Sequence, residues 1–299
     1  MMNGILNVYK EPGFTSFDVV AKLRRILKQK KIGHTGTLDP AAQGVLPVCL
    51  GKATKLCELI TDGSKTYEAV MLLGKTTDTL DMEGTVLSES EASCTDDEVR
   101  AAIMSFVGHC EQIPPMYSAL KVDGKRLYEL ARQGINVERK SRSVDIYEIE
   151  ILYIDLPRAA FRVRCSKGTY IRTLCDDIGR QLGCGACMES LKRTASGRFE
   201  EKDAHRLSEI ERLMDEGKLD SVIIGMDEVF STLPEYRALK SEDKALHNGN
   251  KLHIGNAFED KGHIRVYDSN DEFIGIFRFE ARENILKPVK ILYEKDARE

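Results

Sequence analysis

The most informative stretch of this chain is KIGHTGTLDPAAQGVLP, residues 31–47. It is a glycine-punctuated loop that ends on one carboxylate, Asp39, with Pro40 directly after it. Because proline restricts its own backbone and that of the residue before it, such a loop can hold a single acid in a fixed position. An Asp-Pro pair is also a common start of a surface turn. The stretch alone therefore leaves two interpretations open, an ordinary turn and a loop that presents a functional carboxylate.

Length and composition bound the class of protein. A chain of 299 residues predicts roughly two domains, each with enough apolar residues for a core. No apolar run approaches the roughly 18 residues of a membrane span, and the first residues lack the pattern of a secretion signal. The eight cysteines are scattered without a disulfide-like rhythm, which suits a reducing compartment. We therefore expect a cytoplasmic protein with no membrane segment.

Several cofactor motifs fail when their spacing is checked. Cys184 and Cys187 have the spacing of a metal or redox pair, but no second cysteine pair or paired histidines follow, so structural thiols are favoured. His34 has no partner histidine at ligand spacing, and we expect it to orient the loop or contact a substrate. Residues 51–54 resemble a phosphate loop, but Ala53 follows the lysine where a serine or threonine is required. The sequence therefore predicts neither a metal site nor ATP chemistry.

The net charge of -4 argues against nucleic acid, but the charges are unevenly placed. Basic side chains concentrate in three tracts, residues 22–31, 121–142 and 158–172, while acids gather at 83–98 and 200–220. A single basic tract is usually a solvated helix face. Three such tracts in an otherwise acidic chain favour a surface that follows phosphates.

Periodicity and capping signals predict a mixture of strands and helices. The predicted strands are 4–9, 66–73, 144–156 and 159–166, and the predicted helices begin at the capping boxes of Thr15 and Thr95 and after Tyr170. We expect the second helix to stop at Gly108 with Ile103, Phe106 and Val107 in the core, and the third to end at Gly183. Because strands and helices do not alternate regularly, an α+β fold fits better than a doubly wound one.

Two further regions have their own character. Residues 112–142 interrupt the pattern with two prolines, two glycines and abundant charge, and so long an excursion within a compact domain is usually functional or disordered. After about Thr232 short strands appear, 263–267 and 273–279, joined by a turn-rich connection. We predict a first domain over 1–232 and a small β-rich domain over 233–299.

Residues 33–40, GHTGTLDP, resemble the signature of the TruB family of tRNA pseudouridine synthases, in which the aspartate is the catalytic nucleophile. Matching motifs follow in family order over nearly the whole chain: KTY at 65–67, TDTLD at 77–81, PPMYSALK at 114–121, CSKGTYIRT at 165–173 and LKR at 191–193. The resemblance implies a catalytic domain with a mixed, mainly antiparallel sheet, an inserted RNA-binding arm at 112–142 and a PUA-like C-terminal RNA-binding domain. One departure is Glu11, which stands after Lys10 where the family usually has proline.

The resemblance also implies the site. Isomerising uridine breaks the N-glycosidic bond, turns the uracil and rejoins it through carbon, so the reaction needs an ionised carboxylate in a dry pocket and no cofactor. A neighbouring cation favours the ionised form. The implied catalytic residues are Asp39, its cationic partner Arg172, and Tyr67 against the uracil face; the implied substrate-binding residues are His34, Tyr170, Leu191, Asp81 and Lys10, with no metal.

The expected substrate is tRNA, at the uridine of the T stem-loop numbered 55 in tRNA nomenclature. Extruding that nucleotide costs a few kcal/mol and one aromatic stack returns only about 1–3 kcal/mol, so phosphate contacts of the basic tracts must supply the balance. We expect the arm to order on the RNA, and the protein to act alone as a monomer with no obligate protein partner. Whether the carboxylate attacks the sugar, attacks the base or removes a ribose proton stays open. The alternative function is a non-catalytic protein that binds or folds tRNA.

Overall fold

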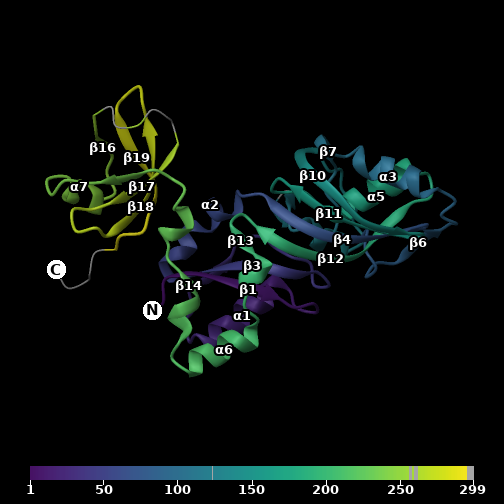
Figure 1. Cartoon of the computed structure of the whole chain (residues 1–299), viewed down its shortest axis with the longest axis horizontal. Coiled ribbons are helices and arrows are strands. Elements are labelled where there is room, and N and C mark those ends of the chain that lie inside the picture. Colours follow the sequence, from purple (N-terminus) through teal and green to yellow (C-terminus); the bar gives the residue numbers. More distant parts are fainter. Residues whose placement is uncertain (123, 256–257, 259–261, 295–299) are drawn as a thin grey trace.

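The computed structural model describes residues 1–122, 124–255, 258 and 262–294. Its main feature is a ten-stranded sheet with the order β14-β1-β3-β12-β4-β11-β10-β7, in which β13 also pairs with β12 and β2 with β3 (Figure 1). The strands are β1 (Gly4–Lys10), β2 (Ile32–His34), β3 (Gln43–Leu50), β4 (Lys65–Leu73), β7 (Gly108–Gln112), β10 (Arg142–Asp155), β11 (Arg158–Cys165), β12 (Ala186–Ser196), β13 (Phe199–Glu200) and β14 (Ile223–Ile224). Within this sheet β12 and β3 run parallel, and the other pairs are antiparallel. The expected mixed, mainly antiparallel α+β fold is confirmed.

Four longer helices cover the sheet in two groups. Helices α1 (Ser16–Ile26) and α6 (Leu207–Asp215) lie together, with α6 beside β1, whereas α3 (Asp96–Met104) lies beside β10 and α5 (Ile171–Gln181) lies beside β12 and β4 (Figure 1). Each group buries its own apolar core against the strands. The predicted capping boxes are present, because the Thr15 and Thr95 side chains accept from the backbone N–H three residues on. The predicted starts of α1 and α3 are therefore confirmed.

The end of α3 differs from the prediction. The helix ends at Met104, and Gly108 has a φ of 116° and opens β7. Ile103 is fully buried and Phe106 packs against the core, but Val107 is 41% exposed because it lies in the turn between helix and strand. The expectation that Val107 is a core residue was wrong.

Shorter strands and helices lie outside the ten-stranded sheet. Within residues 112–142, hereafter the arm, a two-stranded ribbon of β8 (Lys121–Val122) and β9 (Lys125–Arg126) precedes α4 (Leu127–Ala131). A second ribbon pairs β5 (Lys75–Thr77) with β6 (Val86–Glu89). The remaining short helices are η1 (Gly51–Leu56), α2 (Cys57–Thr61), η2 (Glu201–Asp203), η3 (Leu219–Val222) and η4 (Glu228–Phe230). Within the part of the chain described, no helix is both long and apolar enough to cross a membrane.

The C-terminal segment forms a separate five-stranded sheet with the order β15-β17-β18-β19-β16 (Figure 1). Its elements are β15 (Glu235–Arg237), α7 (Asp243–His247), β16 (Leu252–His253), β17 (His263–Tyr267), β18 (Phe273–Glu280) and β19 (Ile285–Ile291). The predicted hairpin of β17 and β18 is confirmed. Ile276 and Leu292 pack with Ile5 and Val45 of the larger sheet, so the two sheets share an apolar contact. The domain boundary at 232/233 stays a prediction.

Candidate active site

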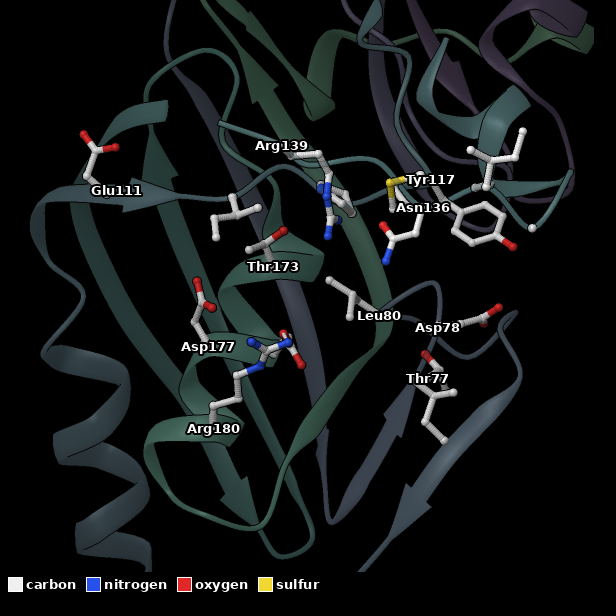
Figure 2. Close-up of a pocket in the computed structure, with 18 residues that line it drawn as sticks. Thr77, Asp78, Leu80, Glu111, Tyr117, Asn136, Arg139, Thr173, Asp177 and Arg180 are labelled. Atoms are coloured by element: carbon white, nitrogen blue, oxygen red, sulfur yellow. Dashed lines mark ion pairs between the residues drawn. The ribbon is translucent and has the colours of Figure 1, made fainter. Parts of the chain in front are cut away.

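Two cavities lie beside the arm. The smaller encloses about 540 Å³ between arm residues such as Tyr117, Asn136 and Arg139 and the α5 residues Thr173 and Asp177 (Figure 2). The larger encloses about 1100 Å³, room enough for a nucleotide. It is lined by all the predicted site residues except Lys10, namely His34, Asp39, Tyr67, Asp81, Tyr170, Arg172 and Leu191. Tyr117 lines both cavities, so the arm forms a shared wall.

The Asp39 loop is held in place by backbone and hydroxyl contacts. The Thr35 N–H donates to the Pro47 carbonyl at 3.0 Å, and the Ser16 hydroxyl accepts from Leu38 N–H at 2.9 Å. After Pro40 the chain turns, with Ala42 N–H donating to the Asp39 carbonyl at 3.1 Å. The loop is thus both the turn that an Asp-Pro pair favours and the support of a carboxylate at the cavity wall.

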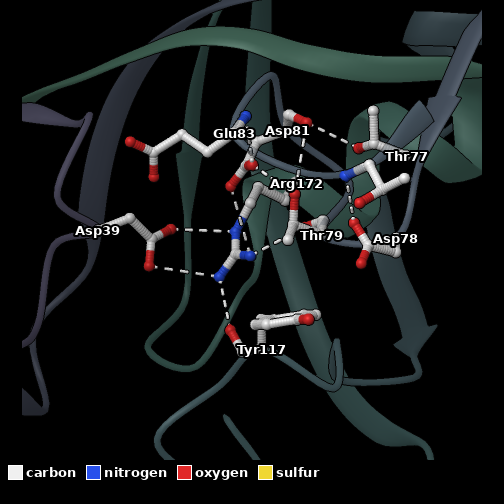
Figure 3. A network of polar contacts seen from close by, with 9 residues as sticks. Asp39, Thr77, Asp78, Thr79, Asp81, Glu83, Tyr117 and Arg172 are labelled. Carbon is white, nitrogen blue, oxygen red and sulfur yellow. Dashed lines mark hydrogen bonds and ion pairs between the residues drawn. The ribbon is translucent and has the colours of Figure 1, made fainter. Parts of the chain in front are cut away.

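Arg172 contacts both oxygens of the Asp39 carboxylate. Its Nε lies 3.0 Å from Oδ2 and its Nη2 donates to Oδ1 at 3.3 Å (Figure 3). The Arg172 side chain is only 6% exposed, against 34% for Asp39. A bidentate contact of this kind fixes the carboxylate in orientation as well as in charge. The cationic partner expected from the sequence is therefore in place, on the first turn of α5.

The rest of the guanidinium is also occupied. Nη1 donates to the Thr79 carbonyl at 2.9 Å and lies 3.5 Å from Asp81 Oδ2, while Nη2 donates to the Tyr117 carbonyl at 2.8 Å. Asp81 is in turn held by the Thr79 hydroxyl, at 2.5 Å, and by the Glu83 N–H, at 3.1 Å (Figure 3). Arg172 is thus shared between two carboxylates and two backbone carbonyls, one of them from the arm.

These charges act on the Asp39 carboxyl in opposite directions. Burial raises its pKa above the ordinary value, the Arg172 cation lowers it, and the neighbouring Asp81 carboxylate raises it. The net direction is upward. Arg172 therefore offsets part of the cost of holding an ionised carboxylate at this position.

Tyr67 lies on the central strand β4 and is 9% exposed. Its direct cross-strand partner on β12 is Arg193, a side chain only 1% exposed. Arg193 donates through Nε to the Val45 carbonyl at 2.7 Å and through Nη2 to the Gly36 carbonyl at 3.1 Å. Among the described residues it forms no ion pair with a carboxylate. Burial raises the pKa of the Tyr67 hydroxyl and the Arg193 cation opposes that rise.

Arg193 was not among the predicted site residues, although it ends the LKR motif at 191–193. Leu191 and Arg193 are two residues apart on one strand and so point to the same face. Both line the larger cavity. The strand alternation therefore contained a signal that places Arg193 beside Leu191.

His34 and Tyr170 complete the walls of the larger cavity. Burial lowers the pKa of the His34 imidazole, and the Arg193 cation lowers it further. Its Nδ1 is buried and has no hydrogen-bond partner within the described part of the chain. A buried ring nitrogen left open beside a cavity is suited to a ligand that completes its hydrogen bonding.

Lys10 is placed differently from the other predicted residues. It is fully buried and does not line the larger cavity. Its ammonium donates to the carbonyls of Glu11, Pro40 and Ala42 at 3.2, 3.1 and 2.5 Å. Burial lowers its pKa to about 8. This geometry favours a role in supporting the Asp39 loop over direct contact with a substrate, because two of the three bonds hold the loop at Pro40 and Ala42 and the third goes to the neighbouring Glu11.

The three basic tracts also differ in the structure. In the third tract Arg158 pairs with Glu189, and Arg162 pairs with Glu68 and Glu150. Neighbouring strands thus supply counter-charges to these two arginines, while Lys167 of the same tract lines the larger cavity, and the expected phosphate-binding surface stays a prediction. In the arm, by contrast, the exposed side chains of Lys121, Arg126 and Arg132 line the larger cavity and form no ion pair among the described residues.

The thiols and carboxylates do not gather into a metal site in the described part of the chain. Cys187 is buried and contacts Met82, with its sulfur 3.6 Å from the Met82 sulfur. The Cys184 sulfur lies 3.5 Å from the carbonyl oxygen of Gly185. These local contacts are those of packed thiols.

Comparison with known proteins identifies the family of this chain. Residues 24–171 match the model of the TruB family pseudouridylate synthase N-terminal domain, and residues 172–231 match that of the tRNA pseudouridylate synthase B C-terminal domain. The tRNA pseudouridine synthase B of Lachnoclostridium phytofermentans is 51% identical over 97% of this chain and 99% of its own length. That of Clostridium acetobutylicum is 47% identical over 92% and 95%.

Solved structures give the same answer for the fold. A Cbf5-Nop10-Gar1 complex contains a chain that superposes with a TM-score of 0.74 at 28% identity, covering 97% of this chain and 84% of its own. An H/ACA RNP bound to a substrate RNA contains another, with a TM-score of 0.73 at 26% identity over 98% and 86%. By family models, near full-length relatives and fold alike, this chain belongs to the TruB family of tRNA pseudouridine synthases.

Proposed function

We propose that this enzyme isomerises uridine 55 in the T-loop of tRNA by base flipping, with Asp39 as the nucleophile. The observation that carries the proposal is the bidentate contact of buried Arg172 with Asp39 at the wall of a cavity of about 1100 Å³. A carboxylate so oriented, and compensated by one cation, meets the requirement for an ionised group in a dewatered pocket.

The chemistry is a balanced isomerisation. The bond between uracil N1 and ribose C1′ breaks, the base turns, and C5 bonds to C1′; the C5 proton leaves and N1 gains a proton. Asp39 acts while the N1 bond is broken, at the sugar, at the base or on a ribose proton. Tyr67 is proposed to stack on the uracil and to take part in the later proton transfer, while Tyr170, Leu191 and His34 enclose the base. Asp81 is proposed to orient Arg172 through its contact with Nη1.

Recognition is assigned to the arm and to the C-terminal sheet. Lys121, Arg126 and Arg132 stand at the cavity without carboxylate partners in the described chain and are available for phosphates of the T stem-loop. Residues 233–299 are proposed as a PUA-like RNA-binding domain. The relatives named tRNA pseudouridine synthase B match almost end to end, which supports tRNA as the substrate. We further propose that the protein acts alone, as a monomer in the cytoplasm.

The test uses an unmodified tRNA transcript and the purified protein alone, followed by carbodiimide labelling to map pseudouridine. We expect one modified position, uridine 55, with no added protein, nucleotide or metal. A transcript with cytidine at that position is the control and should remain unlabelled. Modification elsewhere, or only after a cell extract is added, would contradict the proposed substrate or the stand-alone action.

A further inference from the structure

The side chain of Gln112 hydrogen-bonds the backbone of Tyr170 in both directions. Its Oε1 accepts from the Tyr170 N–H at 2.9 Å, and its Nε2 donates to the Tyr170 carbonyl at 3.1 Å. Gln112 is 3% exposed, so these bonds form away from water. Buried amide bonds of this kind are costly to lose, because the groups left behind find no replacement partner.

The backbone of Tyr170 lies where such a contact can affect the position of Arg172. It directly precedes α5, whose N-terminus receives no hydrogen bond from a capping side chain. Its carbonyl also accepts the first helical bond, from Leu174 N–H at 3.1 Å. Arg172 follows two residues later, so the backbone position of Tyr170 sets where the guanidinium meets Asp39. Gln112 thereby supplies the fixation that a capping side chain gives elsewhere.

Gln112 is also the first residue of the arm. It is the last residue of β7, and its direct cross-strand partner is Arg142, the first residue of β10. The arm therefore leaves the sheet and returns to it beside the start of α5. Between its two ends, the arm is separated from Thr173 and Asp177 of α5 by the smaller cavity (Figure 2). The bond from Arg172 to the Tyr117 carbonyl is a second polar link from arm to helix.

We propose that Gln112 is a positioning residue that acts through the Tyr170 backbone. It keeps Tyr170 and Arg172 aligned with Asp39 when the arm engages RNA. The inference rests on the roles proposed above for those three residues. It predicts an effect on the chemical step and not on tRNA affinity, since Gln112 itself is buried and does not line the larger cavity.

The first test replaces Gln112 with methionine, which keeps the length of the side chain and removes both hydrogen bonds. Misplacing reacting groups by about 1 Å can cost about 10²-fold, so we expect the single-turnover rate at saturating tRNA to fall about 10- to 100-fold with the tRNA dissociation constant unchanged. Gln181→Met is the matched control, because Gln181 is exposed at the far end of α5 and, among the described residues, its side chain bonds only Ser105; it should behave as the native enzyme. A native single-turnover rate for Gln112→Met, or a loss confined to affinity, would overturn the inference.

The second test uses Gln112→Glu and pH. An ionised carboxylate can accept from the Tyr170 N–H but cannot donate to its carbonyl, whereas the protonated acid can do both. The ratio of the single-turnover rates of variant and native enzyme should therefore rise as pH falls from 8 to 5, which a purely structural defect would not produce. A ratio that stays flat and low overturns the inference. The ratio is measured at whichever uridine is modified, while the position of that uridine tests the proposed substrate, so the two proposals can fail separately.

Discussion

The Asp39 loop and the arm contribute to the same cavity, but the protein holds them in opposite ways. In the loop, the Pro40 carbonyl accepts from the Lys10 ammonium and the Leu38 N–H donates to the Ser16 hydroxyl. Arg172 holds the Asp39 carboxylate. The arm presents exposed cations that lack carboxylate partners in the described chain. Preorganised groups favour chemistry because they need no rearrangement at the moment of reaction. Unpaired cations on a long excursion from the sheet favour adaptable binding of phosphates.

Apart from the loss of Asp39 itself, the largest effect is expected from removing the cation that holds it, with Arg172→Met. Its loss leaves the Asp39 and Asp81 carboxylates near each other without their shared cation, which favours protonation of one of them. We expect the single-turnover rate at pH 7 to fall by about 10²- to 10³-fold and the melting temperature to drop.

The matched control for this variant is Arg100→Met on the neighbouring helix α3. Arg100 is exposed, lines neither cavity and forms no ion pair among the described residues, so its loss should change little. If both variants lose the same amount of activity, Arg172 has only a general structural role.

A smaller effect on catalysis is expected from neutralising the exposed cations of the arm. Replacing Lys121, Arg126 and Arg132 together by alanine should weaken tRNA binding about 10- to 100-fold and reduce the slope of log affinity against log salt by about 2–3, because each phosphate contact releases a counterion. The single-turnover rate at saturating tRNA should stay close to native.

The third basic tract provides the control for that experiment. Arg158, Arg162 and Arg164 are as basic in sequence, but each lies against a glutamate. Their triple alanine variant should bind tRNA with native affinity and salt dependence. Equal losses in the two triple variants would show that net charge, and not the arm, governs binding.

The smallest effect concerns pH. Burial raises the pKa of the Asp39 carboxyl, and the Asp81 charge adds to that rise. Asp81→Asn removes the like charge and keeps an oxygen for the Thr79 hydroxyl and Glu83 N–H. The acid limb of kcat/KM, where Asp39 becomes protonated, should then move to lower pH than in the native enzyme. A limb that stays in place or moves to higher pH would contradict the electrostatic account of Asp39.

The contrast also shows what sequence patterns can predict. Strand β4 and the capping boxes at Thr15 and Thr95 follow from local signals, and the structure has them. The pairing of the third basic tract depends on strand register, which places Arg162 between Glu68 of β4 and Glu150 of β10. The charges of a local stretch do not show which residues of distant strands will pair with it.

The burial of Lys10 and Arg193 could not be predicted from the sequence for a related reason. Cations are ordinarily exposed, and both are buried because backbone carbonyls of the 31–47 segment turn toward them. Those carbonyls belong to the same stretch that identified the family. Its sequence therefore pointed to the reaction, whereas the buried cations that support it became visible only in three dimensions.

The central claim is that chemistry resides in the fixed Asp39 site and recognition in the arm. Its most direct test measures tRNA affinity and single-turnover rate side by side for Asp39→Asn and for the arm triple variant. We predict that Asp39→Asn yields no pseudouridine over long incubation while binding tRNA as the native enzyme does, and that the arm variant shows the reverse. Measurable product from Asp39→Asn, or parallel losses of rate and affinity in both variants, would contradict the account.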